Sequence, residues 1–227
     1  MCTDVGNGGC GKSHVIHAIN TTLHGLGKKI LLTSLTGLTA NNISGRTIHS
    51  TVNLPFGGGY RVLPSSSLQR LQAKFSNAVG LVIDEFSMLQ CDQFWIIDKR
   101  LQQIMCNEKP FGGLCVLLAG DPGQLPPIKG DALWSVPKIP RGGVTPAFTK
   151  SLGGHNLFND IEDVIHLKQN LRLDGSDAEA NLFDSFLKRL RNGDLIPDDF
   201  ELVRSNCCEH FTGATNLIEE ALMILTI

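Results

Sequence analysis

The chain has 227 residues, a length that suits one α/β domain with an appendage, or one and a half domains. Its 20 Lys and Arg residues and 22 Asp and Glu residues give a formal net charge of -2, so no overall basic excess indicates nucleic acid, although local basic patches are still allowed. No apolar run approaches the roughly 18 residues that a membrane span needs. Seven cysteines without a Cys-x-x-Cys pair predict reduced thiols in a cytosolic or nuclear compartment.

A glycine-rich stretch near the start of the chain fits the pattern of a phosphate-binding loop. The glycines let backbone N–H groups point into a concave nest that suits phosphate oxygens, and residues 13–19 continue with apolar residues at helical spacing. The alternative is a surface turn with a solvated lysine. In the first interpretation Lys12 reaches the β and γ oxygens of a nucleotide and Ser13 binds Mg²⁺. The residues of the stretch are Gly6, Asn7, Gly8, Gly9, Cys10, Gly11, Lys12 and Ser13.

Strand-like segments lie on both sides of this loop. Residues 1–5 would form the first strand, although Asp4 stands where a buried parallel strand is normally apolar. Residues 30–34 predict a second strand, which leads into a polar segment. Residues 53–67 are rich in Gly, Pro and Ser and indicate a long loop, and residues 68–75 have helical spacing.

An apolar run at residues 79–83 ends in two acids, Asp84 and Glu85. Such a run is typical of a buried central strand, and its carboxyl end is the edge at which a doubly wound sheet binds ligands. Asp84 can therefore bind Mg²⁺ beside the phosphate loop, and Glu85 can polarise a water toward the γ-phosphate. The alternative is an exposed corner at which both acids are helix N-terminal charges.

Two further strands are predicted after a helix at residues 89–105. Residues 114–119 form the first, and the Pro-stiffened turn after it places Gln124 where it can sense a γ-phosphate, unless it is a plain turn. Residues 164–167 form the second, followed by Arg172, which offers a planar fork to phosphates or is a surface arginine. An amphipathic helix at 178–192 and a strand beginning near 221–225 complete the chain.

Four stretches in this order resemble the first motor domain of superfamily 1 DNA helicases, specifically the PIF branch, related to RecD, that travels 5′ to 3′. They are the phosphate loop, Thr-Gly-Leu-Thr-Ala with Gly-Arg-Thr-Ile-His-Ser, Leu-Val-Ile-Asp-Glu-Phe-Ser-Met-Leu, and Gly-Asp-Pro-Gly-Gln-Leu-Pro-Pro-Ile. Residues 110–113 and 187–199 also look like that branch. The resemblance runs from about residue 6 to the end of the chain.

The resemblance implies an α/β fold, a RecA-like P-loop NTPase with a central parallel sheet flanked by helices in residues 1–170. Residues 171–227 would be connecting helices and the beginning of a truncated second motor domain. It also implies roles for individual residues. Lys12 and Ser13 contact phosphate and Mg²⁺, Asp84 contacts the same Mg²⁺, Glu85 is the catalytic base, Gln124 senses the γ-phosphate, Arg172 stabilises the transferring phosphoryl, and Thr36, Gly37, Thr39, Thr47 and His49 lie along single-stranded DNA.

We therefore expect an ATP-dependent DNA helicase that uses ATP and Mg²⁺ and binds single-stranded or forked DNA, with no membrane partner. The family implies genome maintenance, including repair, recombination and telomere maintenance, in a nucleus, a mitochondrion, or the cytosol of a virus-infected or prokaryotic cell. Thr39 stands where the family usually has Ala. The family's adenine-contacting segment and second RecA-like domain are missing from these residues, so another chain or domain would have to supply the latter. The alternative is a nucleotide-binding or DNA-binding module that does not unwind DNA.

Overall fold

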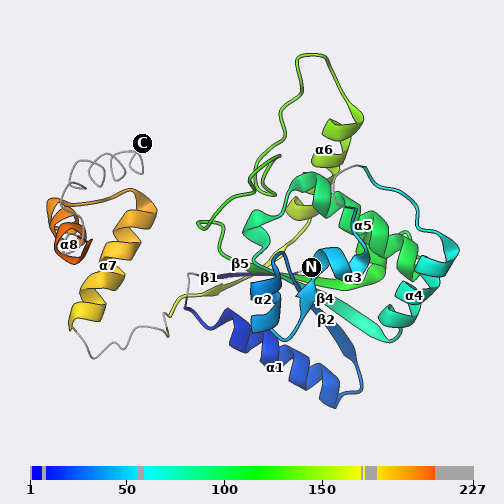
Figure 1. Cartoon of the computed structure of the whole chain (residues 1–227), viewed down its shortest axis with the longest axis horizontal. Coiled ribbons are helices and arrows are strands. Elements are labelled where there is room, and N and C mark those ends of the chain that lie inside the picture. Colours follow the sequence, from blue (N-terminus) through cyan, green and yellow to red (C-terminus); the bar gives the residue numbers. More distant parts are fainter. Residues whose placement is uncertain (1, 7–8, 56–58, 170, 172–177, 208–227) are drawn as a thin grey trace. The chain divides into compact units, whose positions relative to one another are not determined.

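The computed structural model describes residues 2–6, 9–55, 59–169, 171 and 178–207. Packing divides the chain into two compact units, Met1–Asn170 and Leu171–Ile227, and each is described by itself (Figure 1). That the first unit is a complete motor domain and the second the start of another stays a prediction. None of the helices in the described ranges is long and apolar enough to cross a membrane.

The first unit is built on a six-stranded sheet with the strand order β3-β2-β4-β5-β1-β6. All neighbouring strands run parallel, which confirms the predicted α/β class. Parallel neighbours need crossover connections, and these are supplied mainly by helices. The strands are β1 (Cys2–Gly6), β2 (Lys29–Ser34), β3 (Arg46–Thr47), β4 (Ala78–Asp84), β5 (Cys115–Gly120) and β6 (Asp163–Leu167).

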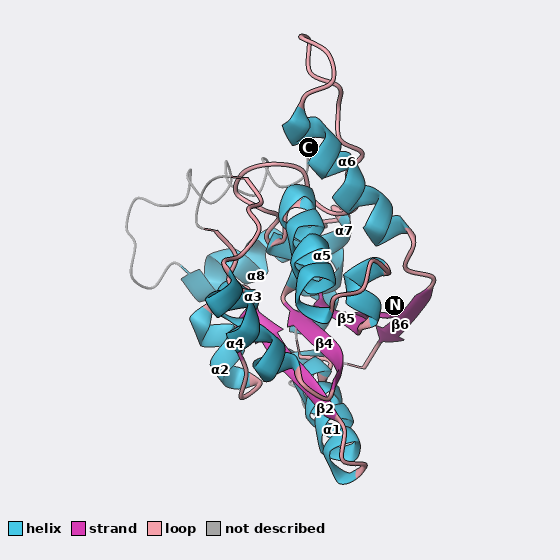
Figure 2. Ribbon diagram, turned by 90° about the vertical axis from the view of Figure 1, so that its right-hand side faces the viewer, coloured by secondary structure: helices cyan, strands magenta, loops and turns pink. Residues whose placement is uncertain are grey.

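Helices cover both faces of this sheet. Successive side chains of a strand point to opposite faces, so one strand can contribute apolar residues to the core on each side. In β4, Leu81 and Ile83 belong to the larger core, on the face covered by the helix of residues 91–105, whereas Val82 packs with Ile16 on the other face. Figure 2 shows α1 on one side of the sheet and α5 on the other. The helices of this unit are α1 (Lys12–Gly25), α2 (Gly37–Asn42), α3 (Ile48–Val52), α4 (Ser65–Phe75), α5 (Cys91–Met105) and α6 (Pro146–Asn159), with 3-10 turns at Phe86–Met88 and Pro110–Gly113.

The helix expected at residues 89–105 begins two residues later, at Cys91. Gln90 is its N-cap, and its side chain and that of Gln93 form a reciprocal capping box. Its apolar stripe is 0 to 3% exposed and belongs to the larger core: Phe94, Ile97, Leu101 and Ile104.

Several local expectations need correction. The loop predicted at residues 53–67 is shorter, because Ser65 already begins α4. The polar segment after β2 forms the short helix α2, and α6 was not predicted at all. The strand predicted at residues 164–167 is confirmed as β6, which lies at the sheet edge with most of its residues exposed.

The second unit contains two helices, α7 (Ala178–Asn192) and α8 (Pro197–Cys207). The predicted helix at 178–192 is therefore confirmed. Arg189 donates hydrogen bonds to both carboxylate oxygens of Asp199, and Ile196 N–H donates to the same carboxylate at 3.0 Å. This cluster joins α7 to the start of α8. The strand predicted at 221–225 lies outside the described residues.

Candidate nucleotide and DNA site

The phosphate-loop sequence begins where β1 ends, at Gly6, and leads into α1. Gly9 and Gly11 have positive φ angles of 87° and 83°, so this turn needs residues without a Cβ. Gly11 is the N-cap of α1, no side chain caps the helix, and its first turn contains no acid. The N–H groups of that turn and the helix dipole therefore suit an anion. Asn7 and Gly8 lie outside the described residues.

Lys12 and Ser13 open α1, directly after this turn. Lys12 is half-buried and Ser13 is exposed, while Cys10 before them is only 5% exposed. Val15 N–H donates to the Gly11 carbonyl at 3.1 Å, so the helix is regular from its first turn. Ile16 anchors it in the core of the α1 face. The two polar side chains are thus held at the start of a packed helix.

The strand register places the two acids beside this loop. Asp84 stands opposite Ala119 of β5, and Val5 of β1 stands opposite Gly120. The carboxyl ends of β4, β5 and β1 therefore lie side by side, with β4 and β1 about 10 Å apart at the ordinary strand spacing. Asp84 is 5% exposed, and one of its oxygens accepts the N–H of Glu85 at 3.0 Å. Asp84 is therefore buried at the end of β4, as the buried-strand interpretation predicts, whereas Glu85 is half-buried and is the N-cap of the 3-10 turn at Phe86–Met88.

Glu85 and Gln124 line one pocket of about 470 Å³. Gln124 follows β5 in a turn that Asp121 shapes: the Asp121 carboxylate accepts the N–H of Gly123 at 2.9 Å, and its carbonyl accepts that of Gln124 at 3.0 Å. Ser87 also lines this pocket; it is 1% exposed, and its hydroxyl is without a hydrogen-bond partner among the described residues. A buried hydroxyl of this kind suits a bound polar group.

The turns after β4 and β5 are packed tightly against each other. A Cβ added at Gly120 would lie 2.9 Å from Cδ1 of Phe86 and 3.0 Å from its backbone nitrogen. Phe86 is fully buried and follows Glu85 directly. Close packing therefore positions Glu85 relative to the turn that carries Gln124.

The residues expected along DNA begin two short helices at the carboxyl ends of β2 and β3. Thr36 is the N-cap of α2 and accepts the N–H of Thr39 at 3.2 Å; Thr47 is the N-cap of α3 and accepts that of Ser50 at 3.3 Å. Gly37 opens α2, and a Cβ there would meet nothing within 4 Å. Hydroxyls and helix-start N–H groups are donors that phosphates can use.

A chain of hydroxyl groups links this segment to the end of β4. Ser34 Oγ donates to the Asp84 carbonyl at 3.1 Å and lies 2.6 Å from Thr39 Oγ1, which lies 2.7 Å from Thr36 Oγ1. Either hydroxyl of each pair can be the donor, and the Thr39 hydroxyl can also donate to the Thr36 carbonyl at 3.3 Å. Ser34 was not predicted as a site residue, although its position at the end of β2 is a signal for one.

His49 lies in α3, two residues after Thr47. Burial lowers the pKa of its imidazole, so the ring is neutral at pH 7. A neutral imidazole can contact DNA through a hydrogen bond or by stacking. Arg172, the remaining predicted site residue, lies outside the described residues.

The sheet order and the two helical layers define a RecA-like α/β protein with a phosphate-loop sequence after its first strand. A family model described as PIF1-like helicase matches residues 4–200. The chain therefore belongs to the PIF1-like helicase family, a family of DNA helicases.

Individual relatives agree with this assignment. The chain is 34% identical over 131 residues to the ATP-dependent DNA helicase PIF1 of Saccharomyces cerevisiae, a match that covers 56% of this chain and 15% of that protein. A Bacteroides Pif1 helicase in complex with ADP-AlF3 and single-stranded DNA superposes with a TM-score of 0.68 at 22% identity, covering 93% of this chain and 47% of that one. A structure of two coordinating Pif1 helicases at forked double-stranded DNA has a TM-score of 0.68 at 26% identity, with coverage of 89% and 46%. The chain thus spans about half of these structures and a smaller part of the yeast relative.

Proposed function

We propose that this chain is the nucleotide-hydrolysing part of a DNA helicase that couples ATP hydrolysis to 5′-to-3′ translocation on single-stranded DNA. One observation carries the proposal: the register of β4, β5 and β1 brings the phosphate loop, Glu85 and Gln124 to one edge of the sheet. A nucleotide hydrolase needs an anion cradle, a base and a phosphate sensor at such an edge.

The chain's own residues divide the work on the nucleotide. The turn at Gly9–Gly11 and the N-terminus of α1 bind the phosphates, and Lys12 adds a cation to the same oxygens. Glu85 accepts a proton from the attacking water, and Gln124, in the same pocket, orients that water or the γ-phosphate. Arg172 is proposed to stabilise the charge that develops on the transferring phosphoryl.

A divalent metal fits the acid and the hydroxyl at this edge. Hard cations such as Mg²⁺ prefer oxygen ligands, and Asp84 and Ser13 supply a carboxylate and a hydroxyl from β4 and α1. When bound with the nucleotide, Mg²⁺ neutralises charge on its phosphate oxygens. The orphaned hydroxyl of Ser87 adds a further polar group to the adjoining pocket.

DNA is proposed to run over α2 and α3, along Thr36, Gly37, Thr39, Thr47 and His49. Contacts through hydroxyl and backbone donors let a chain of net charge -2 bind a polyanion. The solved relatives whose names include single-stranded and forked DNA support this partner. The hydroxyl chain through Ser34 gives this segment a direct connection to the end of β4.

The family resemblance extends the proposal to the biological setting. Work on forked DNA in genome maintenance, in a nucleus, a mitochondrion or a virus-infected or prokaryotic cell, follows from it. A second RecA-like domain, in the same protein or in another, would complete the nucleotide cleft. A chain without that partner would bind nucleotide or DNA without unwinding.

The first test is steady-state ATP hydrolysis by this chain with Mg²⁺, with and without single-stranded DNA. We expect Glu85→Gln to bind ATP as the wild type does and to lose about 10²- to 10⁴-fold in turnover, because the general base is gone. Lys12→Ala is expected to abolish ATP binding in a titration, because the anion cradle loses its cation. Glu108 is an exposed carboxylate away from the site, so Glu108→Gln is the matched control and should change neither ATP turnover nor ATP affinity.

The outcomes of these assays distinguish a working motor from a binding module. DNA-stimulated turnover that depends on Glu85 supports a working motor. ATP binding without turnover supports a binding module that needs a second domain. Turnover in Glu85→Gln equal to wild type would show that Glu85 is not the base, and unchanged ATP affinity in Lys12→Ala would remove the nucleotide-site assignment. The direction of travel is then tested by strand displacement on forks with a single 5′ or 3′ tail.

A further inference from the structure

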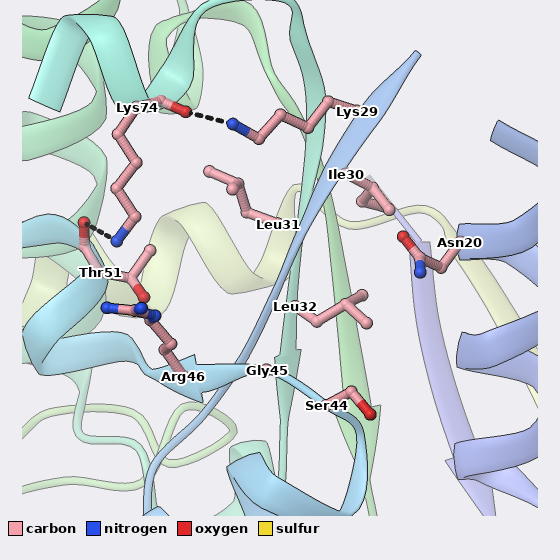
Figure 3. A pocket seen from close by; sticks show the side chains of 10 residues that line it. All are labelled: Asn20, Lys29, Ile30, Leu31, Leu32, Ser44, Gly45, Arg46, Thr51 and Lys74. Atoms are coloured by element: carbon pink, nitrogen blue, oxygen red, sulfur yellow. Dashed lines mark hydrogen bonds between the residues drawn. The ribbon is translucent and has the colours of Figure 1, made fainter. Parts of the chain in front are cut away.

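A second pocket, which we call the edge pocket, lies beside β2 and has a volume of about 500 Å³. Residues from α1, β2, β3, α3 and α4 line it (Figure 3). On this side β3 pairs only with Thr33 and Ser34, so Lys29 to Leu32 form an open edge of the sheet within the described ranges. The edge pocket lies along the amino-terminal half of β2, whereas the nucleotide site lies at the carboxyl ends of β4, β5 and β1. It is therefore a separate feature.

Three cations converge on the edge pocket. They are Lys29 at the start of β2, Arg46 in β3 and Lys74 in the last turn of α4. Figure 3 shows the Lys74 ammonium and the Arg46 guanidinium on the same side of β2, beside Thr51. No carboxylate lines the pocket, and none of the ion pairs found among the described residues involves these three cations.

The cations are held close together by hydrogen bonds to the backbone. Lys29 Nζ donates to the Lys74 carbonyl at 2.7 Å, and Lys74 Nζ donates to the Thr51 carbonyl at 3.3 Å. Each ammonium has three donors, so one such bond leaves capacity for a ligand. Burial, and then the charges of Arg46 and Lys29, lower the pKa of the Lys74 ammonium. Mutual repulsion of like charges in a half-buried site is relieved by an anion.

The pocket also offers neutral donors and a limited apolar wall. Asn20 and Ser44 line the pocket from the other side of β2, away from Lys74 and Arg46 (Figure 3), and Leu31 and Leu32 contribute apolar surface. Guanidinium and ammonium groups around a pocket within the roughly 300–1,000 Å³ of small-ligand sites match a phosphate group in shape and charge.

We propose that the edge pocket binds a phosphate group of single-stranded DNA, as a contact additional to those over α2 and α3. Arg46 directly precedes Thr47, and Thr51 lies in the same short helix as His49, so the pocket is continuous with the proposed DNA surface. In a chain with 22 acids and 20 Lys and Arg residues, such an acid-free cluster concentrates positive charge locally. The inference rests on the proposed function for the source of the phosphate, and on the pocket alone for the anion.

The test measures the affinity of the whole chain for a dT oligonucleotide by fluorescence anisotropy at several salt concentrations. We expect Lys29→Gln/Lys74→Gln to lower the affinity about tenfold at low salt, and to lower the slope of log K against log salt by about 0.7, the value for one lost phosphate contact. Lys28→Gln/Lys109→Gln removes the same charge from exposed positions outside the pocket and should leave the slope unchanged. Lys74→Arg should keep the wild-type slope, and thermal melting of each variant shows whether it folds.

A second arm uses inorganic phosphate and follows backbone amide shifts of Gly45, Arg46 and Thr51 by NMR, in a Lys12→Ala background that removes the phosphate loop. Saturable shifts that the Lys29→Gln/Lys74→Gln changes abolish support the anion site. If the chain with an unchanged edge pocket binds phosphate in that pocket but binds no oligonucleotide, the pocket is a site for free phosphate, and the DNA part of the proposed function fails. If DNA binds equally well to the double variant with the same slope, the edge pocket does not contact DNA. If phosphate causes no shift, the edge pocket is not a phosphate site.

Discussion

Replacing Gly120 by Ala tests the packing that positions Glu85. The added methyl group would lie 2.9 Å from Cδ1 of Phe86, where ordinary contacts begin near 3.4 Å, so one partner has to move by about 0.5 Å. The Phe86 ring is fully buried between Phe158 and Trp134, with ring centroids 6.1 and 6.4 Å away. Its backbone is held too, because the Phe86 carbonyl accepts the N–H of Leu89 at 2.9 Å.

Neither the ring nor the backbone can therefore retreat freely. Overpacking of this kind costs about 1–3 kcal/mol, and no gain from a stiffer unfolded chain offsets it, because Gly120 has a φ of 159° that alanine rarely adopts. We expect a loss of about 1–3 kcal/mol in the free energy of unfolding, measured by equilibrium unfolding in urea. Since misplacement of a catalytic group by about 1 Å can cost 10²-fold, a shift of half that size in Glu85 should lower ATP turnover about tenfold, with little change in ATP affinity.

Gly142→Ala is the matched control, because a Cβ at Gly142 has no neighbour within 4 Å. It should change the free energy of unfolding by less than about 0.5 kcal/mol. If Gly120→Ala is as stable as Gly142→Ala and as active as the wild type, the two turns are not packed as described, and close contact with Phe86 does not position Glu85.

Two further predictions concern the rest of the described chain. Alkylation at pH 8, mapped by mass spectrometry, should label Cys106 and Cys115 quickly and Cys91 slowly. The reason is that Cys91 is fully buried and that its pKa is raised to about 11, chiefly by burial. Equal labelling rates for Cys91 and Cys106 would contradict the burial of Cys91. The Arg189 hydrogen bond lowers the pKa of Asp199 below its ordinary value of 3.8, so the carboxylate stabilises the pairing of α7 and α8 above that pH, and the stabilisation is lost as the pH falls through the lowered value. In Asp199→Asn, the hydrogen-exchange protection of these helices at pH 7 should be as low as that of the wild type at acid pH. Protection equal to that of the wild type at pH 7 would argue against the ion pair.

The strands other than β3, and the longer amphipathic helices, followed from the sequence because their signals are local. The apolar run before Asp84 and the stripe through Phe94 and Leu101 record burial directly in residue type. The short helix α2 and the helix α6 were missed because their hydrophobic periodicity is weak, and tertiary packing stabilises such segments. Cys115 lies in the apolar run that predicts β5, yet it is the first residue of that strand and is exposed, because the strand becomes covered only after it.

The sequence by itself determined the family, the α/β class and the residue types at the candidate nucleotide site, because a phosphate loop and a strand ending in two acids are local patterns with few other uses. Only the tertiary structure decided which ends lie together. The register of β4 with β5 and β1, the hydroxyl chain through Ser34 and the convergence of Lys29, Arg46 and Lys74 join residues far apart in the chain. Such contacts depend on strand order and helix placement, which periodicity along the chain does not encode.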